Sequence, residues 1–462
     1  MKDRFGIDWK RIAEDHGPGS PFWRRPALTR RNFFRHASGA VGGYFLLPEL
    51  NTETIARAQP TLMGTAKNCI FILMRGGPSH IDTFDLKEGS WTPRELEPTT
   101  FGNIRWPRGL MPKLADQMDS IALVRSVKAW ALVHGLAQVW AQIGRNPVAG
   151  SSKIAPHIGS VAAIELSGQQ QDATLPAFVS LNVTSGIGQG YLPPENAPFF
   201  SVPNGSGLGN SRHNDGNARY DRRYGLLLEM DSPLRSSPEL GAAPYQTGTY
   251  NLAARKLVYN SKVDEIFTFD AQERTRYGTT NFGNSCIAAR NMLRARSGAR
   301  FIQITTTDWD HHDNIWGSPT TGHYLRAREF DPALAALIED LKSDGLLNET
   351  LIVAMGEFGR TVGNLTATRG RDHLAQQAVL FAGGGIRGGR VLGSSNAAGN
   401  GTAEPGWSGS RDIRAEDIEA TMYSALGIDW TTIRRDDPLG RGFEYVPGGA
   451  AGIYKPIHEL WT

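Results

Sequence analysis

The chain has 462 residues, 40% of them apolar and 53 of them glycine, so it can bury a large core in one big α/β domain or in two smaller ones. Residues 1–58 hold ten Lys or Arg against six Asp or Glu, whereas the remainder holds 39 against 40, so the near-neutral body gives no electrostatic basis for binding nucleic acid. With only two cysteines, Cys69 in an apolar run and Cys286 in an expected helix, the composition argues against a disulfide framework or a thiolate zinc site.

The start of the chain has the pattern of an export signal. Residues 29–35 (TRRNFFR) fit the twin-arginine motif, and a short, weakly apolar stretch follows at 36–47. Small residues at 56–58 (ARA) stand at the spacing of signal-peptidase cleavage. We therefore predict a twin-arginine leader over residues 1–58, a protein located in the periplasm or at the cell surface, and a domain over 59–462. The alternative is a basic amphipathic arm, and an uncleaved leader would remain as a tether.

Continuous apolar runs predict the buried strands of a mostly parallel sheet flanked by helices. The predicted strands are 68–74, 121–127, 177–182, 299–305, 350–355 and 378–382. Helical spacing is expected over 134–143, 154–166, 251–277, 283–296 and 418–426, and over 331–345 with Asp331 as N-cap and Pro332 in the first turn. Residues 184–250 are rich in Gly, Ser, Asn and Pro, which predicts a long irregular insertion or lid rather than a second domain.

Polar residues follow three of these strands. Asp310 and His312 come after strand 299–305, and Glu357 comes after strand 350–355, in a Gly-rich loop that continues to His373. Ligands bind in the crevice beyond the carboxyl ends of parallel strands, so one metal or oxyanion site assembled from separate loops is expected there. The first strand leads into a loop with Ser79, His80 and Asp82, for which a capped Gly-Pro turn is an equal alternative.

His134 opens the helix predicted over 134–143. A helix N-terminus attracts anions, so this histidine is a candidate catalytic residue. A core or capping histidine explains the position equally well.

Five segments together resemble the bacterial family known as domain of unknown function 1501. They are GGPSHIDTFD (76–85), WDHHDN (309–314), LKSDGLLNETLIVAMGEFGRT (341–361), GRDH (370–373) and FAGGGIRGG (381–389), and the resemblance extends from residue 68 to about 430. That family looks like a branch of the alkaline phosphatase and sulfatase superfamily. The resemblance implies an alkaline phosphatase-like α/β fold, twin-arginine export, and a divalent metal, most simply one Zn²⁺, held by Asp310, His312 and His373.

The second metal site of that superfamily is not matched. Gly76 stands where the resemblance places an Asp after the first strand, and Glu357-Phe358 replaces an Asp-His pair. No Ser, Thr or Cys nucleophile stands at the helix start near His134. Of the ligands of this second site, only Glu357 has a clear counterpart, and His80 or Asp82 are candidates to replace the missing ones.

Two hypotheses remain open. The first is an exported, metal-binding hydrolase of a sulfate or phosphate ester, with sulfated polysaccharide among its candidate substrates. A metal-activated water would attack, Glu357 would serve as a further ligand or base, and Arg360 and Arg371, with Arg75, would hold the anion. Alternatively, the arginines pair with carboxylates such as Glu357 or Asp372 and hold loops together. The second hypothesis, motivated by the missing ligands and the long Gly/Ser-rich insertion, is a non-catalytic cell-envelope scaffold or complex subunit. A nicotinamide or flavin oxidoreductase is disfavoured because no Gly-rich loop joins a strand to a helix.

Overall fold

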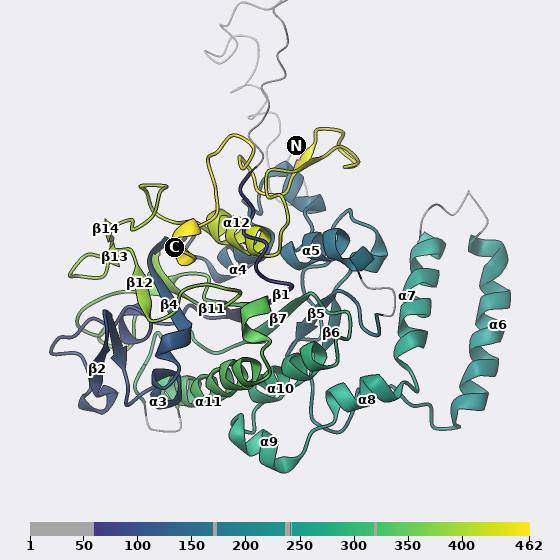
Figure 1. Cartoon of the computed structure of the whole chain (residues 1–462), viewed down its shortest axis with the longest axis horizontal. Helices are drawn as coiled ribbons and strands as arrows, with labels where there is room; N and C mark the ends of the chain where they lie inside the picture. The colour runs from purple at the N-terminus through teal and green to yellow at the C-terminus, as the bar shows by residue number, and fades with distance from the viewer. Residues whose placement is uncertain (1–59, 170–172, 236–240, 242, 318–320) are drawn as a thin grey trace, which may run out of the picture. The chain divides into compact units, whose positions relative to one another are not determined.

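A computed structural model of the chain describes residues 60–169, 173–235, 241, 243–317 and 321–462 (Figure 1). The predicted leader, residues 1–58, lies outside the described residues. Within the described ranges, no helix is long and apolar enough to cross a membrane.

The central sheet has eight strands in the order β12-β4-β11-β8-β1-β7-β5-β6. Their bounds are β1 Asn68–Met74, β4 Ile121–Lys128, β5 Phe178–Leu181, β6 Phe199–Ser201, β7 Phe301–Thr306, β8 Thr350–Met355, β11 Gln376–Gly383 and β12 Arg390–Leu392. Neighbours run parallel except that β11 is antiparallel to both β4 and β8. The predicted mostly parallel α/β sheet is thus confirmed.

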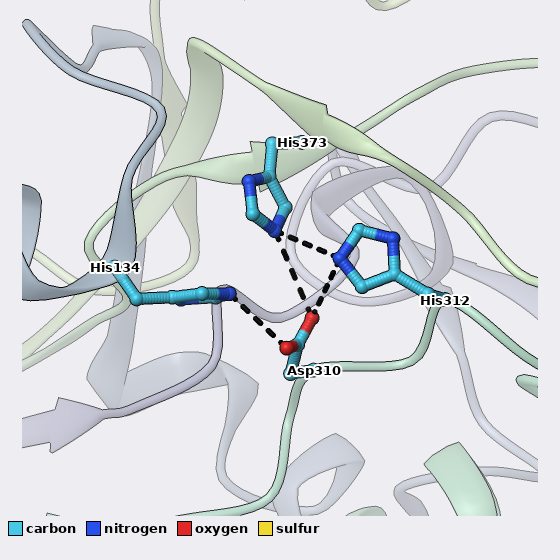
Figure 2. Close-up of side chains that lie close together, drawn as sticks. All are labelled: His134, Asp310, His312 and His373. Carbon is cyan, nitrogen blue, oxygen red and sulfur yellow. Dashed lines mark hydrogen bonds and ion pairs between the residues drawn. The ribbon is translucent and has the colours of Figure 1, made fainter.

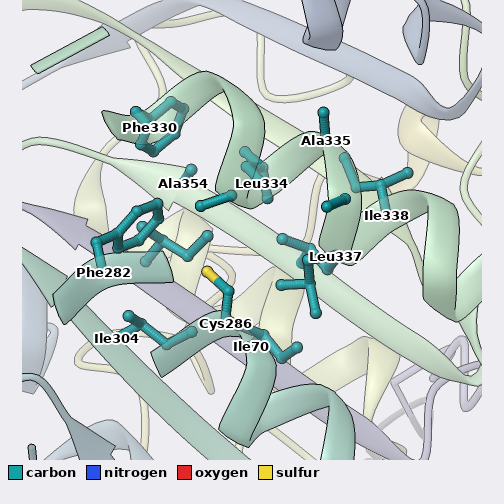
Figure 3. Close-up of a cluster of buried hydrophobic side chains, with 14 of the residues drawn as sticks. Ile70, Phe282, Cys286, Ile304, Phe330, Leu334, Ala335, Leu337, Ile338 and Ala354 are labelled. Atoms are coloured by element: carbon teal, nitrogen blue, oxygen red, sulfur yellow. The ribbon is translucent and has the colours of Figure 1, made fainter. Parts of the chain in front are cut away.

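Alternation along β1 divides the core between the two faces of the sheet. Ile70 and Ile72 enter one cluster, and Cys69 and Phe71 enter the other, as a strand with successive side chains on opposite faces requires. The first cluster is covered by α10 (Asn281–Arg294) and α11 (Gly322–Ser343), as Figure 3 shows, and the second by α5 (Ile158–Leu166) and α12 (Ala415–Ala425). Both faces of β1 are therefore buried, which explains its unbroken apolar sequence.

Helix α11 begins earlier than predicted. It starts at Gly322, so Pro332 lies inside the helix and Asp331 is not its N-cap. The Asp331 carboxylate instead accepts the backbone N–H groups of Lys113 and Leu114, at 3.0 and 2.7 Å, at the start of α3 (Pro112–Ala115). The Asp-Pro pair was misread because its carboxylate serves another helix of the fold.

The segment 184–250 is not irregular as predicted. It contains β6, α6 (Asn217–Arg235) and the first half of α7 (Ala243–Leu257). The two helices lie side by side in Figure 1. Both helices are rich in polar residues and lack a clean apolar stripe, so hydrophobic periodicity could not reveal them. The helix expected over 251–277 is divided by Asn260 and Asp270, which cap α8 (Ser261–Phe267) and α9 (Ala271–Arg276).

Small elements complete the described chain. They are the pairs β2 Pro98–Phe101 with β3 Ile104–Pro107, β9 Gly359–Arg360 with β10 His373–Leu374, β13 Ser394–Ser395 with β14 Thr402–Glu404, and β15 Ile433–Arg434 with β16 Phe443–Glu444, and the helix α4 His134–Ile143. Because β4, β8, β1 and β7 all point the same way, their carboxyl ends meet at one edge of the sheet. The antiparallel β11 begins at that edge, and β10 lies directly before it.

Candidate metal centre

Four side chains from separate loops converge at this edge of the sheet. His134 opens α4 after β4, Asp310 and His312 follow β7, and His373 lies in β10 just before β11. One ligand atom from each lies within 4.8 Å of all the others (Figure 2). We call these four residues the histidine cluster.

The carboxylate of Asp310 lies at the centre of the histidine cluster. Its Oδ1 is 3.1 Å from His312 Nε2 and 3.8 Å from His373 Nε2, and its Oδ2 is 3.2 Å from His134 Nε2. Each of the three imidazoles therefore presents the same nitrogen, Nε2, to one carboxylate.

The outer nitrogen of each imidazole is already engaged. His134 Nδ1 lies 2.7 Å from Glu357 Oε1, His312 Nδ1 lies 3.0 Å from Asp372 Oδ1, and His373 Nδ1 lies 2.7 Å from the carbonyl of Leu132. Carbonyl and ionised carboxylate oxygens only accept, so each Nδ1 must donate its hydrogen. In the neutral rings, every Nε2 then carries a lone pair.

These lone pairs face one another. His312 Nε2 and His373 Nε2 are 2.9 Å apart, and the buried Nε2 of His134 has no hydrogen-bond partner among the described residues. Lone pairs and a carboxylate directed at one place repel unless a positive charge lies between them, and the guanidinium of Arg360 reaches only Asp310 and His312. Three neutral imidazoles and one carboxylate are a donor set that suits a divalent transition metal such as Zn²⁺. The residues present therefore fit the ion that the sequence predicted.

The charge states at neutral pH agree with this donor set. Burial alone would raise the pKa of Asp310, but the hydrogen bond and charge of Arg360 outweigh it and hold that pKa below 3.8. Burial lowers the pKa of His373 below 6.5, and the charge of Arg360 acts in the same direction. The carboxylate is therefore ionised and the imidazole neutral, which are the forms that bind a metal.

Glu357 lies behind the cluster rather than inside it. Its Oε1 accepts from the Gly76 backbone N–H at 2.9 Å, from Gln138 Nε2 at 2.9 Å and from His134. The side chain is buried, and its Oε2 has no partner among the described atoms. Glu357 thus fixes the tautomer and orientation of His134, as carboxylates commonly do for metal-binding histidines.

Gly76 explains why no carboxylate follows the first strand. It has a φ of +113°, and a Cβ there would come within 2.5 Å of the Asp310 backbone nitrogen and 2.7 Å of that of Trp309. Only glycine allows the loop after β7 to approach so closely. The close approach that brings Asp310 into the cluster therefore excludes an aspartate at position 76.

Arg360 is buried against the histidine cluster with all of its hydrogens engaged. A guanidinium has five N–H donors. Those of Arg360 are directed to the carbonyls of Gly76, Gly77 and Arg371, to the carboxylate of Asp310, and to His312 Nε2. In this arrangement the guanidinium neutralises Asp310 and braces three loops, with no N–H left for a ligand.

Arg371 does not reach the cluster. Its Nε donates to Asp82 Oδ2 at 2.7 Å, its Nη1 donates to the carbonyls of Thr361 and Gly363, and its side chain is completely buried. Ser79 also donates to Asp82, at 2.5 Å, and His80 Nε2 lies 2.8 Å from the carbonyl of Gly399. We call Ser79, His80, Asp82 and Arg371 the closed network. For these residues the structure favours the loop-holding alternative over a direct contact with a ligand.

Arg75 is linked to the cluster through Gln138 and is open to a ligand. It is exposed at the end of β1, and its Nε donates to Gln138 Oε1 at 3.0 Å. The described residues supply it with no carboxylate partner. Because Gln138 also binds Glu357, Arg75 is held beside the histidine cluster while its terminal nitrogens stay available.

Several residues that support the cluster were missed by the sequence reasoning. Asp372 holds His312, the Leu132 carbonyl holds His373, and Gln138 joins Glu357 to Arg75. The buried ring of Phe358 packs against His134 and His373, with ring centroids 4.9 and 4.4 Å away. The GRDH segment contained a signal for Asp372, but no side-chain pattern reports a backbone carbonyl.

Comparisons with known proteins place the chain by sequence and by structure. A family model described as "Protein of unknown function (DUF1501)" matches residues 66–447. A search of the curated proteins finds no match.

Similar solved structures include three hydrolases. A sulfatase from Pseudoalteromonas sp. has 13% identity and a TM-score of 0.37, with 85% of this chain and 72% of that one covered. A phosphonate monoester hydrolase from Silicibacter pomeroyi has 11% identity and a TM-score of 0.36, with 78% of this chain and 73% of that one covered. Alkaline phosphatase from the Antarctic bacterium TAB5 has 14% identity and a TM-score of 0.31, with 70% of this chain and 92% of that one covered. Likeness at this level carries no information on activity or substrate.

Proposed function

The chain belongs to the DUF1501 family of proteins of unknown function, and from its histidine cluster we propose that it is an exported, metal-dependent hydrolase of sulfate or phosphate esters. One observation carries this proposal. Three imidazoles are fixed through Nδ1 by partners that only accept, so that all three Nε2 lone pairs meet at the Asp310 carboxylate. A cluster built only to support the fold would not direct three lone pairs at one carboxylate.

The ligands of the ion would be His134, Asp310, His312 and His373. A divalent ion held there would supply a Lewis acid and would lower the pKa of a water bound as a fifth ligand beside these four. The four ligands include no hydroxyl or thiol nucleophile, so we assign the attack on the ester to water. Glu357 acts through His134, whose ring it orients, rather than as a ligand.

The guanidinium groups would bind the ester anion. Arg75 is exposed, and no carboxylate of the described chain neutralises it. The Nη1 of Arg360 lies 3.3 Å from His312 Nε2, whose single lone pair cannot serve both this N–H and an ion. Arg360 would therefore gain one free N–H for an ester oxygen when His312 acts as a ligand.

A non-catalytic envelope subunit is the second candidate. It is favoured by the loss of a second metal position, since Gly76 leaves no space for a carboxylate and Glu357 is engaged by three protein donors. A scaffold of this kind would co-purify with a stoichiometric partner and hydrolyse no ester.

The decisive test is elemental analysis of the protein purified without chelators. We expect about one equivalent of a divalent metal, lost in Asp310→Ala and in His373→Ala. His213→Ala is the matched control, because that histidine lies outside the cluster. Retention of metal by both cluster variants would contradict the ligand assignment, and a metal-free wild type would favour the scaffold. A loaded protein inactive on a broad panel of sulfate and phosphate esters would rule out the hydrolase.

Export rests on the sequence of residues 1–58 alone. Replacing Arg30 and Arg31 together by lysine is expected to keep the protein in the cytoplasm, which cell fractionation measures. An unchanged distribution would contradict the twin-arginine route.

A further inference from the structure

A cavity shares helix α4 with the histidine cluster. Its volume is about 550 Å³, and its wall includes Trp130, Trp140, Arg435, Arg441, Phe443 and Tyr454. We call it the Trp–Arg pocket. Trp130 and Trp140 lie on either side of His134 in the sequence, whereas Arg435, Arg441 and Phe443 come from the β15–β16 hairpin.

The aromatic wall is held in place by polar contacts at its rear. Trp130 and Trp140 are stacked, with centroids 6.0 Å apart and ring planes 24° apart. Both indole N–H groups donate to the carboxylate of Glu416, at distances of 2.9–3.1 Å, and the guanidinium of Arg414 covers Trp130 at 3.8 Å from the ring centroid. Their hydrogen-bonding edges are thus turned away from solvent, yet 45% of Trp130 remains exposed. Exposed tryptophan fixed in this way is typical of a binding surface.

The opposite wall carries two positive charges that the described protein does not neutralise. Arg435 and Arg441 are both exposed, and neither forms an ion pair with any described residue. The neighbouring acids are engaged elsewhere. Asp436 binds Arg434, and Asp437 accepts from the backbone N–H groups of Leu439, Arg441 and Gly442.

The wall that carries these charges is fixed to α4. The Arg145 guanidinium lies 3.9 Å from the centre of the Phe443 ring and donates to the carbonyls of Glu444 and Tyr445. This buried arginine, just beyond the end of α4, thereby ties β16 to the helix that carries Trp140. The pocket is therefore formed before any ligand arrives, which reduces the entropy cost of binding.

We propose that the Trp–Arg pocket is a binding site for an anionic oligosaccharide, separate from the metal centre. The apolar C–H face of a sugar ring suits the electron-rich face of a tryptophan, and a sulfate, phosphate or carboxylate substituent suits a guanidinium. Hydroxyl groups both donate and accept, so they also suit the mixed polar rim of Asn146, Glu444 and Tyr454. A nonpolar ligand would leave both arginines without a counter-ion.

The pocket lies a short distance along α4 from the histidine cluster. Trp140 lies six residues after His134 in one helix, which corresponds to about 9 Å along the axis at 1.5 Å per residue. Residues six apart lie about 120° apart around a helix, so the pocket and the histidine cluster are on different sides of α4. Binding in the pocket requires no metal and no hydrolysis.

Calorimetric titration of the metal-free protein tests the proposal without relying on catalysis. The probes are sulfated maltohexaose, unsulfated maltohexaose and inorganic sulfate, at one ionic strength. Two variants address the two walls, the double variant Arg435→Ala/Arg441→Ala and the single variant Trp130→Ala. The charge-matched control is Arg94→Ala/Arg108→Ala, because both control residues are exposed and lie outside the pocket.

We expect sulfated maltohexaose to bind more tightly than either other probe. The double variant should weaken it about a hundredfold, because losing one charge-assisted hydrogen bond usually costs about tenfold. Trp130→Ala should weaken both oligosaccharides, and the control should change nothing. Equal binding of sulfated and unsulfated probes, equal weakening by the control, or no binding of sulfated maltohexaose would overturn the proposal. Hydrolysis of small esters in those cases would leave the proposed function intact.

Discussion

The histidine cluster and the closed network use the same residue types at the same edge of the sheet, yet they are built on opposite principles. In the closed network, Asp82 accepts from both Arg371 and Ser79, and its side chain is completely buried. In the histidine cluster, by contrast, the Nε2 atoms of His312 and His373 face each other at 2.9 Å. One set of polar groups is satisfied by the protein, whereas in the other Arg360 reaches only Asp310 and His312, and His134 Nε2 has no hydrogen-bond partner among the described residues.

The GRDH segment shows how finely these principles can alternate. Arg371 belongs to the closed network, Asp372 holds His312 from outside, and His373 is a member of the histidine cluster. Three successive residues thus have three different uses. The hydrogen-bond partners of each atom, rather than the motif, separate a ligand from a structural residue.

The largest effect that separates the two regions should come from Asp82→Ala. This change leaves the Arg371 guanidinium buried without its counter-ion, which typically costs about 3–5 kcal/mol of folding free energy. Denaturant unfolding of the metal-free protein measures it. A loss below about 1 kcal/mol would mean that the closed network does not stabilise the fold.

Asp372→Ala is the matched control for that experiment. The Asp372 side chain is 64% exposed, so its removal should change stability by less than about 1 kcal/mol. Metal affinity should fall, however, because His312 loses the partner of its Nδ1. Equal destabilisation by the two variants would abolish the distinction between the regions.

A smaller effect, confined to the histidine cluster, should come from Glu357→Gln. The amide can still accept a hydrogen bond from His134, but it no longer carries the charge that makes the imidazole a stronger ligand. Changes of this kind typically lower metal affinity about 10–100-fold. Competition with a chelator measures the constant, and Glu404→Gln, the same change at an exposed position outside the cluster, serves as a control. An unchanged constant would show that His134 is not a ligand.

Much of the fold could be predicted from the sequence because both faces of the central strands are buried. The strand at 68–74 and the helix at 134–143 have the predicted bounds. Helix α6 and the first half of α7 were missed because their polar sequences carry little periodicity. The start of α11 was misplaced because the Asp331 carboxylate binds a distant helix. A local pattern cannot report a partner more than 200 residues away.

The same limit applies to the candidate site. Asp310, His312 and His373 could be grouped from the sequence because loops after parallel strands meet at one edge. Their function as ligands remains a prediction. The sequence could not separate Arg371 from Arg360, since each is an arginine in a Gly-rich loop and only their buried partners differ.

The pH dependence of the unfolding free energy also distinguishes the closed network from the histidine cluster. Burial lowers the pKa of His80 below its ordinary 6.5. Below pH 6.5 the unfolded chain takes up a proton that folded His80 does not, so this contribution to stability is complete above pH 6.5 and lost as the pH falls. His80→Gln should therefore flatten unfolding free energy measured between pH 7.5 and 5.5, whether or not Zn²⁺ is added. A change in slope that appears only with Zn²⁺ would connect His80 to the histidine cluster.

The smallest effect on folding should come from Arg75→Ala. The side chain is exposed, and its one described hydrogen bond goes to Gln138, so the free energy of unfolding should change by no more than about 0.5 kcal/mol. Yet the KM for a sulfate or phosphate ester should rise about tenfold with kcat unchanged, because the lost charge binds ground state and transition state alike. Arg94→Ala controls for net charge. A fall in kcat at constant KM would instead place Arg75 against charge that develops during the reaction, and no change in either constant would leave anion binding to Arg360.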